Sequence, residues 1–184
     1  MWTATRRFAA MAVVLGISTA SRADGPAFKA GFAERDVSPA IGEEQPGGYG
    51  KAYHKVFHDP CKARAVVFDD GKTRAALVGL DALVIRGETV REVRAAIEAK
   101  TGIPAGSIMI AASHSHSAGP TGMFLPGEFD DASPLVKHLV NDETVNGDGP
   151  YLEKVKAGIV DAVVEADAKR VAAKAGVGFG KAEG

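Results

Sequence analysis

The sequence has 184 residues and only one cysteine, Cys61, which excludes two kinds of stabilisation. A single cysteine cannot form a disulfide within the chain. A structural zinc site built from thiolates is also excluded, because such sites need two to four cysteines. Stability must therefore come from packing, or from a metal held by His, Asp, Glu or Tyr. We expect Cys61 to be a small buried hydrophobic residue.

An excess of charge of one sign is also lacking. The formal net charge is −1, from 22 basic and 23 acidic residues, so the chain has neither a basic nucleic-acid footprint nor an acidic tail. Aromatic residues make up only 7% of the chain, although 46% of the residues are hydrophobic. We therefore expect no nucleic-acid partner, a core of Val, Ala and Ile, and one domain or at most two.

No apolar run reaches the length of about 20 residues that crosses a bilayer. Phe8–Ile17 is apolar, follows a pair of arginines and precedes Ser21-Arg22-Ala23, whose outer residues are small. This pattern is typical of a signal peptide, here residues 1–23. A membrane anchor is the alternative, but the run is too short for one. We expect an exported protein, periplasmic or secreted, with no transmembrane segment and a mature chain that begins at Asp24.

Hydrophobic periodicity predicts an α/β fold. Strands are predicted at Ala30–Val37, Ala63–Phe68, Thr73–Leu80, Ser107–Ala112 and Val171–Phe179, and helices at Arg86–Thr101 and Tyr151–Ala168. The second and third strands form a hairpin, and the fourth reads as a buried strand. This β-ββ-α-β-α-β order favours a layered β-sheet with flanking helices. Ser117–Pro150 is predicted to be a loop, and a loop of that length is usually functional or disordered.

The main chemical signal is a pair of histidines, His114 and His116, just after the apolar strand Ser107–Ala112. Strand side chains alternate between faces, so residues two apart can point the same way. Ligands of α/β sheets bind at the carboxyl ends of strands, and neutral imidazole is a zinc ligand. The pair is therefore a candidate metal site. The pattern alone also allows two polar residues at the start of a surface loop.

Two further polar residues could belong to the same site. Asp81 closes the strand Thr73–Leu80 and could fix the tautomer of an imidazole, or could be a solvated residue at a strand end. His58 could line the same cleft, although a role in a turn is favoured for it. His54 and His138 lie in polar loops and are expected at the surface.

The long loop Ser117–Pro150 is expected to border this cleft. It could offer an apolar lip for an acyl chain, formed by Phe124, Leu125 and Phe129. Other catalytic signatures are missing from the sequence, because it has neither a Gly-x-Ser-x-Gly elbow nor a Gly-x-x-x-x-Gly-Lys phosphate loop.

The order of these motifs resembles that of the neutral/alkaline non-lysosomal ceramidase family. The matching stretches are Ala30–Pro39 (the family's opening strand), Gly48-Tyr49-Gly50 (its Gly-rich segment), His58–Ala65, Leu80-Asp81 and His114-Ser115-His116-Ser117 (its "HTHS" motif). The resemblance extends from about Ala30 to the end of the chain. Two departures are Cys61, where the family has leucine, and the inserted Ala118.

The resemblance implies a zinc-dependent hydrolase that cleaves the N-acyl amide bond of ceramide to sphingosine and a fatty acid. It implies that His114 binds Zn²⁺ and that the catalytic His116 lies beside the metal-bound water or substrate. The family's other zinc ligands (His, Glu and Tyr) and its active-site arginine have no match here. We therefore expect residues 24–184 to be the incomplete N-terminal part of a larger catalytic domain.

Two other functions remain open. The same domain could carry another metal-dependent amide or ester hydrolase, or it could be a catalytically inactive exported binding domain. A small-molecule or lipid amide substrate is expected for the enzyme. A lipid amide would also bring the protein into peripheral contact with a membrane.

Overall fold

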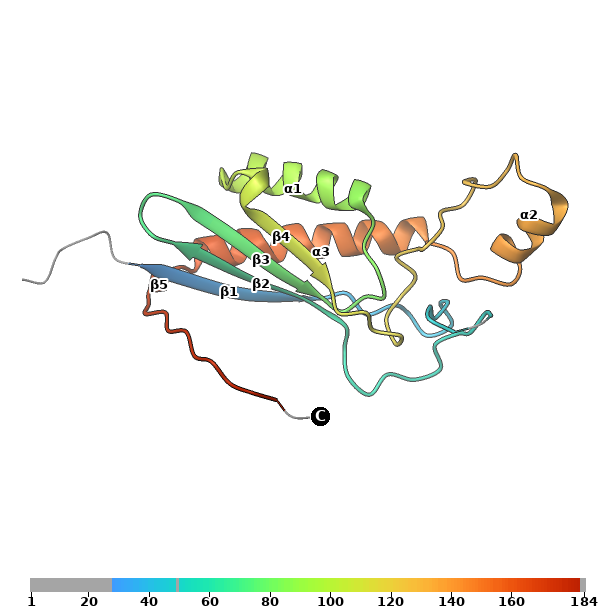
Figure 1. The fold of residues 1–184 in the computed structure, drawn as a ribbon, viewed down its shortest axis with the longest axis horizontal. Coiled ribbons are helices and arrows are strands. Elements are labelled where there is room, and N and C mark those ends of the chain that lie inside the picture. Colours follow the sequence, from blue (N-terminus) through green and yellow to red (C-terminus); the bar gives the residue numbers. More distant parts are fainter. Residues whose placement is uncertain (1–27, 49, 183–184) are drawn as a thin grey trace, which may run out of the picture.

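The computed structural model describes residues 28–48 and 50–182, so the predicted signal peptide, residues 1–23, lies outside the described residues (Figure 1). The strands are β1 (Lys29–Asp36), β2 (Lys62–Asp69), β3 (Arg74–Leu80), β4 (Ile108–Ala112) and β5 (Val171–Ala172). The helices are α1 (Gly87–Thr101), α2 (Pro134–Asn141) and α3 (Gly149–Ala168), with a short 3₁₀ helix, η1 (Ala105–Ser107), before β4. The predicted α/β layered architecture is confirmed, with α2 as an addition.

The strands form one sheet in the order β4-β3-β2-β1-β5. β2 and β3 form the predicted hairpin, with Asp69 opposite Arg74. β3 and β4 are parallel and are joined through α1, whereas the other neighbours pair antiparallel. Parallel strands end at the same edge of a sheet, and here Leu80 lies opposite Ala112. The segments that follow β3 and β4 therefore start side by side.

Helices α1 and α3 cover one face of the sheet and form the core with it (Figure 1). Alternate strand residues face the helices because the side-chain period of a strand is two. The buried residues are Ala63, Ala65 and Val67 of β2, Ala76, Val78 and Leu80 of β3, Ile108 and Ile110 of β4, Val93 and Ile97 of α1, and Val155, Ile159 and Val163 of α3. Strand β1 and helix α3 are in direct backbone contact at Gly31, where a Cβ atom would lie 2.0 Å from the carbonyl oxygen of Ala166.

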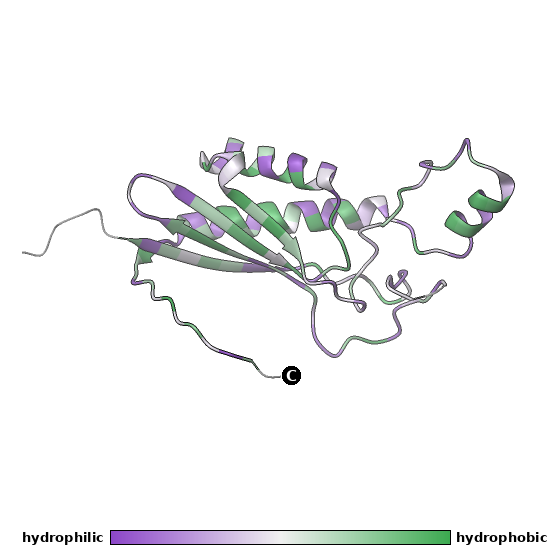
Figure 2. Ribbon diagram, in the orientation of Figure 1, coloured by the Kyte–Doolittle hydropathy of each residue, from purple (hydrophilic) through white to green (hydrophobic). Residues whose placement is uncertain are grey.

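The opposite face of the sheet exposes a row of apolar side chains. Phe32, Leu77 and Met109 are 68%, 40% and 56% exposed. The strand register places Phe32 opposite Val66, Val66 opposite Leu77 and Leu77 opposite Met109. Figure 2 shows that the strands are largely hydrophobic. The prediction that the fourth strand is buried therefore holds for one of its faces only.

Helix α2 lies within Ser117–Pro150, which the sequence analysis assigned to a loop. Ser133 caps this helix, because its Oγ accepts the Val136 N–H at 3.4 Å, and Pro134 occupies its first position. With only eight residues, α2 is too short for its periodicity to stand out from the surrounding glycines and acids. In Figure 1 it lies beyond the end of α3, away from the sheet.

The last strand is shorter than predicted. Only Val171 and Ala172 pair with β1, whereas the prediction extended to Phe179, which is 99% exposed. Within residues 28–48 and 50–182, no helix combines the length and the apolar character that a membrane span requires.

Replacing Gly31 by alanine should destabilise the fold by about 3 kcal/mol, because the new methyl group meets the backbone of α3 and cannot be accommodated by a side-chain rotation. The matched control is Gly79→Ala on the open face of the sheet, where a Cβ atom has no neighbour within 4 Å. This control should change stability by no more than about 0.5 kcal/mol. Chemical denaturation measures both, and equal midpoints would contradict the packing described here.

Candidate functional site

The two histidines lie on the segment that follows β4, residues 113–118, here called the histidine loop. This segment stays paired with the chain that follows β3. The Ser113 N–H donates to the Leu80 carbonyl at 2.9 Å, and the Ser115 N–H donates to the Ala82 carbonyl at 3.1 Å. The parallel pairing of the two strands thus continues beyond their ends and determines where the histidines lie.

His114 has a left-handed backbone, with φ of 63°, and is the only described residue other than glycine with a positive φ. Such a conformation is uncommon outside glycine and is concentrated at functional sites. The ring is held by the Leu83 carbonyl, which lies 3.0 Å from Nδ1. A carbonyl can only accept, so Nδ1 carries the proton. With Nδ1 engaged, Nε2 is the nitrogen that the neutral imidazole of His114 offers to a ligand.

His116 lies next to His114, with ring centroids 5.1 Å apart and ring planes at 85°. The alternation of strand side chains predicted both rings on one side. The rings do lie together, but the cause is different. β4 ends at Ala112, and the left-handed turn at His114 brings the rings together.

Both rings line a cavity of about 190 Å³. Its walls are Pro46, Gly47, Gly48, Leu83, His114, His116, Met123, Thr144 and Val145. Gly47 packs directly on His116, since a Cβ atom there would lie 2.5 Å from the ring Cγ. Met123, Thr144 and Val145 come from residues 119–148, here called the arm, which contains α2. The expectation that this stretch borders the cleft therefore agrees with the geometry.

The predicted apolar lip is arranged differently from expectation. The rings of Phe124 and Phe129 pack edge to face at 5.3 Å, and Phe124, Leu125 and Phe129 are all partly buried. None of the three lines the histidine cavity, where the neighbouring Met123 lies instead. Met123 is 57% exposed, so it supplies the apolar surface at this side of the cavity.

Asp81 lies at the predicted strand end, but its carboxylate is engaged elsewhere. Asp81 Oδ2 accepts the Lys62 N–H at 2.9 Å and an Arg64 Nη1 hydrogen at 2.8 Å. The chain turns after Leu80 and directs Asp81 toward β2. Of the two alternatives for Asp81, the contact with an imidazole is therefore not what the structure shows. The Leu83 carbonyl takes that place at His114.

His58 lies in a different cavity from the histidine pair. Its side chain is 97% exposed, and Nδ1 lies 2.9 Å from Asp59 Oδ2. The cavity that it lines has a volume of about 550 Å³ and also contains Ser115 and Ser117. The histidine loop separates the two cavities, because its serines line one and its histidines line the other. The turn role favoured for His58 agrees with this exposure.

Two residues, Gln45 and His54, touch the histidine loop although the sequence did not predict either contact. Gln45 Nε2 donates to the His116 carbonyl at 2.8 Å, and His54 Nε2 donates to the Ala118 carbonyl at 3.0 Å. His54 is only 4% exposed, so the prediction that it lies at the surface is wrong. Its ring packs against Phe57, with centroids 4.6 Å apart. Neither residue lies in a periodic segment, and no local sequence signal pointed to them.

The other calls on single residues agree with the structure. Cys61 is buried, as predicted, and burial raises the pKa of its thiol. Its Sγ lies 3.5 Å from the Ser117 carbonyl. His138 is exposed, as predicted, and its Nδ1 lies 2.8 Å from Asp142, which raises the pKa of the imidazole.

The start of the arm is anchored beside the cavity by an ion pair. Arg86 donates two hydrogen bonds to the Glu128 carboxylate, at 2.8 and 2.6 Å, and one to the Met123 carbonyl at 3.2 Å. Glu128 also accepts the Leu125 N–H at 2.9 Å. These donors favour the charged carboxylate and lower the pKa of Glu128 to about 2, with Arg86 as the largest cause.

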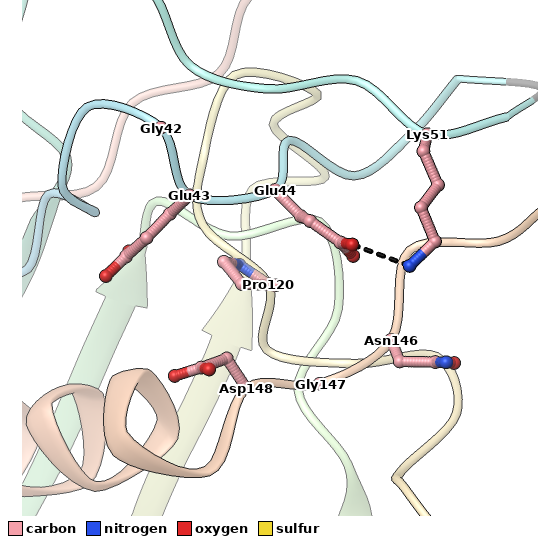
Figure 3. Close-up of a pocket in the computed structure, with 8 residues that line it drawn as sticks. All are labelled: Gly42, Glu43, Glu44, Lys51, Pro120, Asn146, Gly147 and Asp148. Carbon is pink, nitrogen blue, oxygen red and sulfur yellow. Dashed lines mark hydrogen bonds and ion pairs between the residues drawn. The ribbon is translucent and has the colours of Figure 1, made fainter. Parts of the chain in front are cut away.

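A third cavity, of about 330 Å³, lies between the arm and the loop after β1 (Figure 3). It carries three acidic residues, but each has a structural partner. Glu44 pairs with Lys51 at 2.6 Å, Glu43 accepts the Ala40 N–H, and Asp148 caps α3. Among the residues that the structure describes, no three His, Cys, Asp or Glu side chains are grouped so that they could hold a metal ion.

Comparisons with known proteins give a likeness of fold. No protein-family model and no curated protein sequence matches the chain. The crystal structure of neutral ceramidase from Pseudomonas aeruginosa is similar at a TM-score of 0.63 and 19% identity, over 80% of this chain and 22% of that chain. A ceramidase complexed with C2 is similar at a TM-score of 0.54 and 20% identity, over 78% and 22%.

At these identities the likeness concerns the fold alone. The chain spans 22% of the length of either structure, so its sheet and helices correspond to part of a ceramidase. The predicted fold, an α/β part of a larger domain of this kind, is consistent with that correspondence.

Replacing Gly47 by alanine should displace the His116 ring, because the methyl group would overlap it. Gly42→Ala is a matched control: φ is 97° at Gly47 and 92° at Gly42, but a Cβ atom at Gly42 has no neighbour within 4 Å. Both changes carry the cost of a left-handed alanine, about 1–2 kcal/mol. Only Gly47→Ala should shift the His116 ring resonances in a ¹H–¹³C spectrum. An unchanged His116 signal would refute this packing.

The Arg86–Glu128 pair predicts a pH dependence of the arm. The folded pKa of Glu128 is depressed, so the anchoring is complete above the ordinary carboxylate range and is lost as the pH falls toward about 2. Arg86→Gln should raise this pKa toward the ordinary value, as measured by ¹³C carboxyl titration. Arg91→Gln, which removes an exposed arginine on α1, is the control and should leave Glu128 unchanged.

Proposed function

We propose that residues 24–184 are the N-terminal part of the catalytic domain of a ceramidase-like hydrolase, which cleaves an N-acyl amide bond. The observation that supports this most is the histidine pair. It lines a cavity at the carboxyl ends of two parallel strands, in a sheet whose fold is similar to part of neutral ceramidase. The proposed substrate is a lipid amide such as ceramide, and the proposed cofactor is Zn²⁺.

His114 is the proposed metal ligand. Imidazoles that bind metals usually donate the other ring N–H to a carbonyl or a carboxylate, which fixes the ring and its tautomer. The Leu83 carbonyl supplies this contact at 3.0 Å. His114 therefore presents Nε2 with a free electron pair and a fixed direction, as a metal ligand requires.

His116 is the proposed proton-transfer group. A neutral imidazole can take a proton from water and return it to the leaving amine. Its ring lies 5.1 Å from that of His114, so both can face one bound amide group. Asp81 acts in this proposal only indirectly, by holding Lys62 and Arg64 at the strand ends, and His58 has no part in it.

The described residues do not by themselves fit a catalytic zinc site. Such sites take three protein ligands and keep one position for water. Here the pair offers two imidazoles, and the described residues contain no group of three donors. Zn²⁺ thus requires further donors from polypeptide that the structure does not describe.

The apolar Met123 and Val145 at the cavity suit an acyl chain more than a charged group. A lipid amide substrate implies peripheral contact with a membrane, and the N-terminal pattern supports export to the periplasm or the medium.

Another metal-dependent amide or ester hydrolase, or an inactive exported binding domain, is the alternative.

The chain should bind zinc weakly and hydrolyse N-acylsphingosine slowly or not at all, because two imidazoles hold zinc less well than a full set of ligands. His114→Ala should abolish the residual zinc binding measured by calorimetry. His138→Ala, on the exposed side of α2, is the matched control and should have no effect. Stoichiometric zinc with clear turnover would show that the described donors suffice.

Ligand binding should distinguish the alternatives even without turnover. A short-chain N-acylsphingosine should shift the backbone resonances of Gly47, Met123 and Val145, because these residues line the cavity. The corresponding ester and an N-acyl peptide test the other hydrolase classes. A ligand that shifts none of these resonances would remove the lipid amide as the substrate of this cavity.

A further inference from the structure

Three consecutive carbonyl groups of the histidine loop each face a side chain from the segment between β1 and β2. The donors are Gln45 Nε2 to the His116 carbonyl at 2.8 Å, Cys61 Sγ to the Ser117 carbonyl at 3.5 Å, and His54 Nε2 to the Ala118 carbonyl at 3.0 Å. The thiol is the weakest of these donors. The amide and the imidazole therefore provide most of the attachment.

His54 is held so that its ring cannot easily leave. It is 4% exposed, and its ring packs on Phe57. Its backbone pairs across the loop that contains Gln45, since the His54 N–H donates to the Glu43 carbonyl at 2.9 Å and the Gly42 N–H donates to the His54 carbonyl at 2.8 Å. A buried imidazole donor with fixed geometry can order the carbonyl that it binds.

His116 is held at both ends by one short stretch of this segment. Gln45 binds its carbonyl, and Gly47, two residues later, packs against its ring. The opposite side of the histidine loop is paired with the chain after β3 through Ser113 and Ser115. The loop is therefore fixed between two segments, and the distance between the two imidazole rings depends on both.

We infer that Gln45 and His54 are positioning residues, which hold the histidine loop so that the His116 ring stays beside that of His114. Their importance for catalysis rests on the proposed function, because it matters only if the pair acts on a substrate. The positioning itself involves neither zinc nor substrate and can be measured without them.

Four variants of the full chain test this inference. His54→Leu removes the donor but fills the buried space, and His54→Gln restores an N–H donor. Gln45→Met removes the amide at similar length, and its site is only partly buried, so the fold should survive. Leu139→Ala, on exposed α2, is the matched control. Denaturation midpoints report global folding for each variant.

The readout is the nuclear Overhauser cross-peak between the His114 and His116 ring protons, together with the amide resonances of residues 116–118. His54→Leu and Gln45→Met should each lose the cross-peak and shift these amides at an unchanged unfolding midpoint. His54→Gln and Leu139→Ala should keep both. If His54→Leu does not fold, the result with Gln45→Met decides.

A retained cross-peak in the folded Gln45→Met variant would overturn the inference, and so would failure of His54→Gln to restore the signals. The outcome is separate from that of the zinc and hydrolysis experiments. If the wild-type chain shows the cross-peak but binds neither zinc nor lipid amide, the positioning stands while the proposed function fails.

Discussion

The parallel pairing of β3 and β4 is the constraint on which the rest of the site depends. It places Leu80 opposite Ala112, so the segments that leave the two strands run together instead of diverging. The carbonyls of Leu80 and Ala82 accept hydrogen bonds from the N–H groups of Ser113 and Ser115. The Leu83 carbonyl accepts a hydrogen bond from the His114 ring. A hairpin could not produce this arrangement, because antiparallel neighbours end at opposite edges of the sheet.

This pairing also explains how a left-handed histidine is tolerated. A non-glycine residue with positive φ costs about 1–2 kcal/mol. At His114 the cost is offset by the hydrogen bonds of Ser113 and Ser115 on either side and by that of the ring itself. Each such bond contributes roughly 1 kcal/mol net. The local strain is therefore maintained by contacts that follow from the sheet topology.

The strands, the two long helices and the position of the histidine pair just after β4 could be predicted because each depends on nearby residues. Near alternation indicated β1, the turn at Asp69-Asp70-Gly71 separated β2 from β3, a short apolar run indicated β4, and helical spacing indicated α1 and α3. What could not be predicted depends on distant loops. Gln45 lies 71 residues from His116, and His54 lies 64 residues from Ala118. The contact with an imidazole that was one of two alternatives for Asp81 is absent for a related reason, since Arg64 and the Lys62 N–H occupy its carboxylate.

The two histidines differ in how they are held, and this difference favours different roles for them. The His114 ring is fixed through its own Nδ1–H, so its remaining nitrogen has one direction, as a metal ligand requires. The His116 residue is fixed through its carbonyl and by the contact of its ring with Gly47, whereas no described residue hydrogen-bonds to its ring nitrogens. An imidazole whose nitrogens are not engaged by the described residues can exchange protons with water or substrate. Under the proposed function, this difference assigns metal coordination to His114 and proton transfer to His116, and both residues line the same 190 Å³ cavity.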